Sequence, residues 1–247
     1  MKRTLLALIA LAAAVTPSCT KQDNSPSGPD WVTITIGLTP AVDSGRFPTK
    51  GIGEDIAATL PSQMTLSLTN KATGESFEVV TGTSVRVPAG TYTAAGRTSP
   101  APLQFIYDPT HYTSREPLIV VEDELEITTA GAHYVTAGYR CFVAAIPTAE
   151  VSYWWLTTAN GRAEVARNTG TENGWIFVIG DFGTDQYFRT GVTFVDGEQQ
   201  EYQFQTRDLQ AGSILAEYGK WYLLRQQGGT PQNGTIALRF PEWTAGN

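Results

Sequence analysis

The stretch QMTLSLTNKATGESFEVVTGTSVRVPAGTYTAAG, residues 63–96, decides the fold of this chain. It starts with three apolar residues that alternate with serine and threonine, a period of two that gives a β-strand one apolar and one polar face. These three residues are Met64, Leu66 and Leu68. Asn70 and Gly74 then bound a short turn, because both residue types accept left-handed backbone angles. Two further turns separate the valine pairs and Tyr92, so the stretch predicts a β-meander of four short strands.

The composition extends this prediction to the whole chain. Charged residues make up 17% of the 247 residues and aromatic residues 11%, which is typical of a β protein with an apolar core and little helix. A single sheet would leave its apolar face in water, so a second sheet must cover it. We therefore predict an all-β fold with two β-sandwich domains, residues 31–132 and 133–247, each of the usual domain size.

The other strands follow from the same patterns. Residues 31–38 alternate and predict a first strand, which the long irregular segment of residues 39–60 ties loosely to the meander. Residues 175–179 are almost wholly apolar and predict a central strand buried on both faces. The Asp-Gly pair at residues 196–197 predicts a two-residue hairpin with a type I′ turn. Residues 209–218 are predicted to form one short helix.

The N-terminal residues have the pattern of an export signal. Residues 1–18 have a cationic start, an apolar run too short to span a bilayer of about 30 Å, and small residues before Cys19. A cysteine at this place, followed by the polar residues of the segment 19–30, resembles a bacterial lipoprotein with an acylated cysteine and a flexible tether. We predict a signal peptide over residues 1–18, lipidation at Cys19 and a lipid anchor in the outer membrane. A soluble exported protein cut near Ser18 is the alternative.

Cys141 is the other cysteine of the chain. If Cys19 carries lipid, Cys141 has no partner for an intramolecular disulfide, although an exported protein would allow one. It lies in the apolar run VTAGYRCFVAAI, residues 135–146, where no neighbour in sequence would stabilise a thiolate. We predict that Cys141 is a small buried hydrophobic residue.

Several of these features together resemble one protein family. They are the lipoprotein leader, the alternating first strand, a long loop with an arginine, the stretches LPSQMTLSLTNKATGE and VPAGTYTA, and a second all-β half. In this combination the chain looks like the fimbrillin superfamily of the Bacteroidetes. The resemblance implies a precursor with two transthyretin-like or Ig-like β-sandwich domains, located at the cell surface or in a fimbrium and without a catalytic centre.

The resemblance also implies a route of assembly. In the family, proteolysis after an arginine beyond the first strand removes that strand, and a strand of the next subunit fills the apolar groove. The matching arginine here is Arg46, and the strand removed would be residues 31–38. A detachable strand at a sheet edge suits strand addition. In the alternative, Arg46 is an ordinary solvated loop residue, and a stalk subunit, a tip or accessory subunit and a non-polymerising relative remain open.

Motifs for catalysis and metal binding are absent from the sequence. The histidines, His111 and His133, have no metal-ligand spacing, and neither a P-loop nor a GxSxG elbow occurs. The acidic residues of the segment 122–126 favour a solvated turn over a catalytic carboxylate pair. A net charge of −7 without a basic stripe argues against nucleic acid as a partner. We expect no enzyme activity, no cofactor and no metal site.

Trp154 and Trp155 are the best candidates for contact with a ligand. Adjacent strand residues point to opposite faces, so one indole packs in the core and the other could stack on a sugar ring. This would suit a glycan-binding surface lipoprotein of a polysaccharide uptake system, which is our alternative function. The leading hypothesis is a non-catalytic, surface-anchored fimbrial subunit or tip adhesin that joins other fimbrial subunits by β-strand addition. A host protein or glycan is a further possible partner, and the membrane is contacted through the lipid alone.

Overall fold

The computed structural model describes residues 30–40, 61–105, 108–147, 149–167, 174–225 and 231–235. All regular elements in these ranges are β-strands, which confirms the all-β prediction. The described residues from Trp31 onward belong to one compact unit. Within the same ranges, no helix has the length and apolar character needed to cross a membrane.

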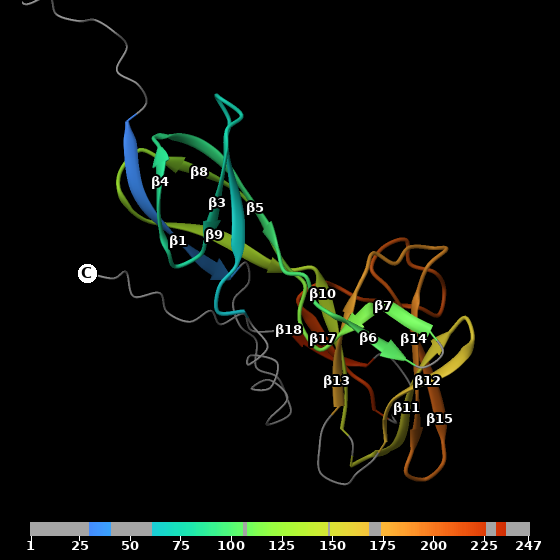
Figure 1. Ribbon diagram of the computed structural model, residues 1–247. Coiled ribbons are helices and arrows are strands. Elements are labelled where there is room, and N and C mark those ends of the chain that lie inside the picture. Colours follow the sequence, from blue (N-terminus) through green and yellow to red (C-terminus); the bar gives the residue numbers. More distant parts are fainter. Residues whose placement is uncertain are drawn as a thin grey trace, which may run out of the picture. The chain divides into compact units, whose positions relative to one another are not determined.

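Sheet A is the sheet that contains the predicted meander (Figure 1). Its strands are β1 (Trp31–Pro40), β2 (Thr65–Asn70), β3 (Ser76–Val80), β4 (Ser84–Pro88), β5 (Gly90–Arg97), β8 (Ile119–Ile127) and β9 (Gly131–Tyr139). Their order is β3-β2-β5-β8-β9-β1-β4. The short turn of residues 81–83 joins β3 to β4, yet these strands lie at opposite ends of the order. Sheet A is therefore rolled so that its two edges approach each other.

The remaining strands form sheets B and C (Figure 1). Sheet B has the order β18-β17-β10-β13-β7-β6, and sheet C has the order β12-β11-β14-β15-β16. The strands of sheet B are β6 (Pro102–Phe105), β7 (Asp108–Ser114), β10 (Cys141–Ile146), β13 (Gly174–Ile179), β17 (Lys220–Leu223) and β18 (Gln232–Thr235). Those of sheet C are β11 (Val151–Thr158), β12 (Gly161–Arg167), β14 (Phe188–Phe194), β15 (Gln199–Gln205) and β16 (Ile214–Leu215).

Strand pairing crosses the predicted division of the chain. β9 stays in sheet A as far as Tyr139, beyond the predicted boundary between residues 132 and 133. β6 and β7 precede that boundary but belong to sheet B, where β7 pairs with β13. A change of sheet therefore does not occur at the predicted boundary, and the division into two sandwich domains stays a prediction.

Two local predictions are wrong. The Asp-Gly hairpin has a three-residue loop, because the amide of Phe194 donates to the carbonyl of Glu198 at 2.8 Å. Gly197 has a φ of +92°, but Asp196 is not left-handed, as a type I′ turn would require. No helix forms over residues 209–218, where Gly212 has a φ of +83° and β16 pairs with β15.

Two apolar clusters fill the fold. The first cluster includes Ile34, Ile36, Leu38, Leu66, Leu68, Val79 and Tyr92 of sheet A, and Cys141, Val143, Ala145, Phe177 and Trp221 of sheet B. The second cluster includes Phe142, Ala144, Ile146 and Val178 of sheet B, and Trp154, Leu156, Val192 and Phe194 of sheet C. Alternate residues of β10 and β13 therefore lie in different clusters. Both strands are buried on both faces, which confirms the prediction for residues 175–179.

We predict that Ile36→Ala lowers the free energy of unfolding by about 2–5 kcal/mol, because it removes a fully buried side chain from the first cluster. Thr33→Ala, at an exposed position of the same strand, should cost less than about 0.5 kcal/mol. Urea denaturation followed by tryptophan fluorescence measures both. Equal costs for the two variants would contradict the packing of β1 against this cluster.

Candidate functional site

The sites predicted for lipidation and processing, Cys19 and Arg46, lie outside the described residues. The structure does not test them, and both stay predictions. Trp154 and Trp155 lie in β11 and are described in full.

Trp154 points into the second cluster and has an exposed fraction of 0%. Its indole Nε1 donates a hydrogen bond of 2.7 Å to the hydroxyl of Thr190, which in turn donates to the carbonyl of Trp155 at 2.7 Å. A buried tryptophan usually satisfies its N–H in this way. Trp154 is therefore a core residue.

Trp155 points to the other face of sheet C, yet its exposed fraction is also 0%. Its ring lies so close to the backbone of Gly191 that a Cβ added there would be 2.2 Å from the indole. Tyr153 stacks beside it, with ring centroids 5.7 Å apart and an interplanar angle of 19°. The guanidinium of Arg162 lies 4.2 Å from the ring centroid and covers the remaining side.

Arg162 is held over Trp155 by two residues of β15. Its Nη2 atom forms an ion pair of 3.2 Å with Glu201, and its Nη1 atom donates to the amide oxygen of Gln199 at 3.3 Å. The side chain thus extends from β12, at one edge of sheet C, across the indole to β15. This contact was not predicted from the sequence, because Gln199 and Glu201, which hold Arg162, are 37 and 39 residues away from it along the chain.

The burial of both indoles removes the platform expected for sugar stacking. A sugar ring needs an accessible aromatic face, and neither Trp154 nor Trp155 offers one in this structure. Tyr153 is half-buried and is itself faced by the guanidinium of Arg167, at 5.6 Å. Arginine side chains therefore lie over both Trp155 and Tyr153 on this face of sheet C.

The first strand, β1, offers the clearest functional geometry in the described chain. Its inward residues, Ile34, Ile36 and Leu38, have exposed fractions of 1%, 0% and 5% and belong to the first cluster. They fill alternate positions of one strand, so their three side chains occupy a continuous line of the core. This alternation is the one that the sequence predicted.

The pairing of β1 corrects one expectation. β1 is not an edge strand, because β9 lies on one side of it and β4 on the other. It pairs in parallel with β9 over residues 34–40 and antiparallel with β4 over residues 31–35. The amide of Gly82, in the turn before β4, also donates to the carbonyl of Ile36 at 2.9 Å. Removal of β1 would therefore expose one edge of β9 and leave β4 without its strand partner.

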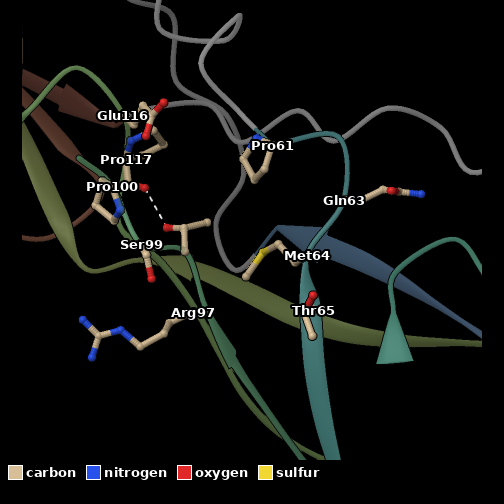
Figure 2. A pocket seen from close by; sticks show the side chains of 10 residues that line it. Pro61, Gln63, Met64, Thr65, Arg97, Ser99, Pro100, Glu116 and Pro117 are labelled. Atoms are coloured by element: carbon tan, nitrogen blue, oxygen red, sulfur yellow. Dashed lines mark hydrogen bonds between the residues drawn. The ribbon is translucent and has the colours of Figure 1, made fainter. Parts of the chain in front are cut away.

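A pocket of about 340 Å³ lies at one end of sheet A (Figure 2). Three prolines contribute rigid walls, and Arg97 and Glu116 contribute one charge of each sign. Within it, the hydroxyl of Thr98 donates to the carbonyl of Pro117 at 2.8 Å, which ties β5 to the segment before β8. A larger pocket of about 660 Å³ shares Arg97 and includes Arg140 and Tyr218. The sequence did not predict either pocket.

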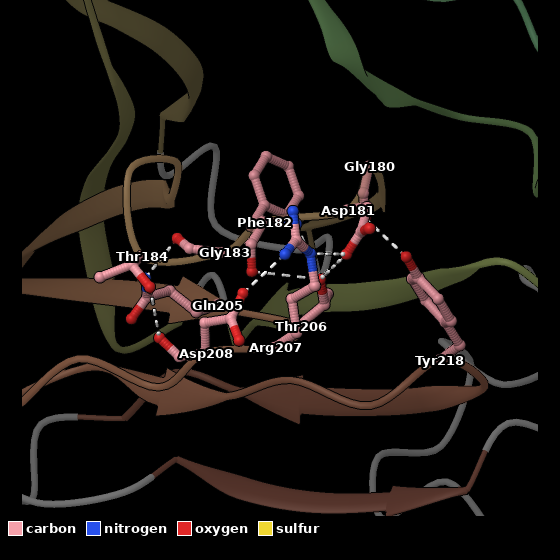
Figure 3. Close-up of polar contacts among 10 residues, drawn as sticks. All are labelled: Gly180, Asp181, Phe182, Gly183, Thr184, Gln205, Thr206, Arg207, Asp208 and Tyr218. Atoms are coloured by element: carbon pink, nitrogen blue, oxygen red, sulfur yellow. Dashed lines mark hydrogen bonds and ion pairs between the residues drawn. The ribbon is translucent and has the colours of Figure 1, made fainter.

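A polar network links the ends of β13 and β15 (Figure 3). Asp181 accepts hydrogen bonds from the hydroxyl of Thr206 at 3.1 Å and from Nε of Arg207 at 3.0 Å. Arg207 also pairs with Asp208 at 2.6 Å, and the hydroxyl of Tyr218 donates to the carbonyl of Gly180 at 2.9 Å. One guanidinium pairs with both carboxylates, so this network holds two loops together.

The acidic residues of the segment 122–126 lie in strand β8 and not in a turn. Glu122 pairs with Arg140 at 3.6 Å, and Glu124 pairs with Lys71 at 2.7 Å. The amide of Thr136 donates to Asp123 at 2.8 Å and lowers the pKa of that carboxyl below its usual value. Each of these three carboxylates thus has its own partner, and no group of three potential metal ligands occurs among the described residues.

Cys141 is buried in the first cluster, as the sequence predicted. Burial raises the pKa of its thiol to about 12, and its nearest polar contact is the carbonyl of Leu118, at 3.6 Å. The thiol is therefore protonated and unreactive at neutral pH.

Comparison with known proteins gives structural similarities alone. No protein-family model and no curated protein matches the chain. The tip fimbrial protein Mfa3 from Porphyromonas gingivalis, solved with a C-terminal truncation, is 10% identical with a TM-score of 0.46, over 84% of this chain and 99% of that one. A "putative cell adhesion protein" from Bacteroides eggerthii is 11% identical with a TM-score of 0.41, over 89% and 94% of the two chains.

A third similar structure has a different description. It is one of the "putative polysaccharide binding proteins" from Bacteroides thetaiotaomicron, 12% identical with a TM-score of 0.33, over 86% of this chain and 98% of that one. Each of the three is a protein that this chain is similar to.

We predict that Arg162→Ala makes Trp155 accessible to solvent, because the guanidinium covers the open side of the indole. Acrylamide quenching of tryptophan fluorescence should increase, and the increase should be absent when Trp155→Phe is also present. Arg167→Ala is the matched control, since its guanidinium faces Tyr153 and not the indole. Unchanged quenching in Arg162→Ala would show that other groups cover the ring.

We predict that Cys141 does not react with Ellman's reagent at pH 8 in the folded protein, because the pKa of its buried thiol is about 12. The experiment uses Cys19→Ser, which leaves Cys141 as the one remaining thiol of the two in the sequence. One thiol per chain should appear when urea is added. Rapid reaction in the folded protein would contradict the burial of this residue.

Proposed function

We propose that this chain is a non-catalytic surface adhesin or fimbrial subunit that joins its neighbours by exchange of the strand in the β1 position. The observation that carries the proposal is the line of three buried side chains on β1, Ile34, Ile36 and Leu38. Burial of each is worth about 1.5–3 kcal/mol. A foreign strand with the same alternation could therefore replace β1 at a comparable free energy, by the mode of β-strand addition.

The backbone supports the same proposal. The C-terminal half of β1 pairs with β9 and its N-terminal half pairs with β4. An open β9 edge would hold unpaired N–H and C=O groups, which strongly favour pairing with another strand. A vacant groove would thus combine apolar pockets with a hydrogen-bonding edge, the two elements that an incoming strand needs.

The proposal gives roles to the two residues outside the described ranges. Cleavage after Arg46 would disconnect β1 from the rest of the chain, and lipid on Cys19 would anchor the precursor at the cell surface until that cleavage. A cut alone leaves β1 in place, because its side chains remain buried. Release then requires a competing strand, which couples loss of the first strand to arrival of the next subunit.

The alternative function, glycan binding in a polysaccharide uptake system, has less support. It depends on an accessible aromatic platform, and both predicted indoles are buried. We place this alternative second, as a role that the Arg162→Ala variant could reveal if opening of the indole creates affinity for a sugar.

We predict that limited digestion with an arginine-specific protease cuts the folded chain after Arg46 and that the cut protein, on a native gel, then assembles with an added subunit or peptide that carries a β1-like strand. Intact mass gives the cleavage position. Arg46→Gln is the matched control and should stay uncut there and monomeric. A clean cut without assembly, in the presence of an added β1-like strand as well as in its absence, would contradict strand exchange.

A further inference from the structure

Gly37 is covered by a tyrosine ring on the outer side of sheet A. β1 lies beside β9 (Figure 1), and Gly37 is in register with Tyr134. A Cβ added to Gly37 would lie 2.7 Å from both the Cδ1 and the Cε1 atoms of that ring. Gly37 points outward, between the inward Ile36 and Leu38, and is nevertheless buried. The ring therefore lies directly on the backbone of β1.

The requirement for glycine at this position is steric. The φ of Gly37 is not in the left-handed region, so any residue could adopt its backbone conformation. Valine would even be preferred in a strand over glycine. The ring of Tyr134 alone stands in the place where a side chain would go.

The other outward positions of β1 place no such restriction on their residue. Thr33 is exposed, and the hydroxyl of Thr35 lies 3.2 Å from that of Ser84. The hydroxyl of Thr39 donates to the carbonyl of Val135 at 3.2 Å. Small and medium side chains fit at all three positions. Gly37 is therefore the outward position of β1 at which the neighbouring strand, β9, restricts the size of the residue.

We propose that Tyr134 selects the strand that occupies the β1 position, by requiring glycine in register with its ring between two inward apolar residues. This inference rests on the proposed strand exchange. It gives the partner a sequence pattern of five residues: apolar, any, apolar, glycine, apolar. In β1 the pattern is ITIGL, residues 34–38.

The pattern restricts which segments of the printed sequence fit the β1 position. Apart from residues 34–38, the pattern occurs in this sequence at residues 135–139, VTAGY, which belong to β9 and are already paired in sheet A. The alternating C-terminal segment TIALRF, residues 235–240, lacks glycine. Aligning its three apolar residues with those of β1 places Arg239 under the Tyr134 ring. Neither of these two segments therefore fits the position that β1 leaves.

The contact itself is tested in the intact chain with a double-mutant cycle. Gly37→Val should lower the urea midpoint of unfolding when Tyr134 is present. In the Tyr134→Ala background the same substitution should leave the midpoint unchanged or raise it, because valine favours a strand. Thr33→Val is the matched control and should respond equally in both backgrounds. Absence of coupling between Gly37 and Tyr134 would overturn the inference.

The selection is tested by strand exchange into the chain cut between residues 41 and 60, at Arg46 or at an introduced protease site. Labelled peptides are added and their binding is followed by fluorescence anisotropy. The peptide of residues 31–40 should exchange into the protein, and its Gly37→Val form should bind about tenfold more weakly. With Tyr134→Ala, the two peptides should bind within about threefold of each other.

A peptide of residues 232–243 serves as the third probe. It should exchange at least about tenfold less well than the peptide of residues 31–40, because Arg239 meets the ring of Tyr134. Equal exchange of these peptides, or of the glycine and valine forms, would overturn the inference. Failure of every peptide to exchange would instead overturn the proposed function, whereas the double-mutant cycle would still decide the role of Tyr134.

Discussion

β1 is the strand on which sheet A depends. It is the strand partner of β4 and one of the two partners of β9, so β4 is joined to the other strands of the sheet through it. Its two halves pair with different neighbours, in opposite orientations, and overlap only at Ile34 and Thr35. The rolled sheet thus depends on β1, which is itself stabilised by the burial of three side chains, Ile34, Ile36 and Leu38. Any process that removes β1 must replace both its hydrogen bonds and its apolar surface.

Sheet B sets a second constraint, because apolar clusters lie on both of its faces. Consecutive residues of β10 belong to opposite clusters, and so do those of β13. A strand buried on both faces cannot slip by one residue without exchanging its two sets of side chains. The register of β10 and β13 is therefore fixed, and sheet B would keep its structure if β1 were exchanged. In the proposed function the exchangeable element is confined to sheet A, where β1 is followed by a segment of irregular sequence.

The alternation of β1 and the continuous apolar run of residues 175–179 predicted their faces correctly, because a period of two is a local property. The sequence could not show that β1 lies between β9 and β4, since pairing is decided by strands about 50 and 100 residues away. Arg162 was missed because the residues that hold it over Trp155, Gln199 and Glu201, are 37 and 39 residues away from it. The predicted helix at residues 209–218 failed because Gly212 adopts a left-handed conformation. Arg46 and Cys19 remain sequence predictions.

The glycine that weakens β1 is also what makes it selective. Glycine in a strand interior costs roughly 0.5–1 kcal/mol relative to alanine, so position 37 lowers the intrinsic stability of the strand. Tyr134 covers the backbone at this position, and a larger residue there would have to displace its ring, which is 55% exposed. β1 is held by alternate buried residues and carries one steric restriction, at Gly37. It is stable enough to complete the fold. In the proposed exchange, another strand with glycine at the same position would replace it.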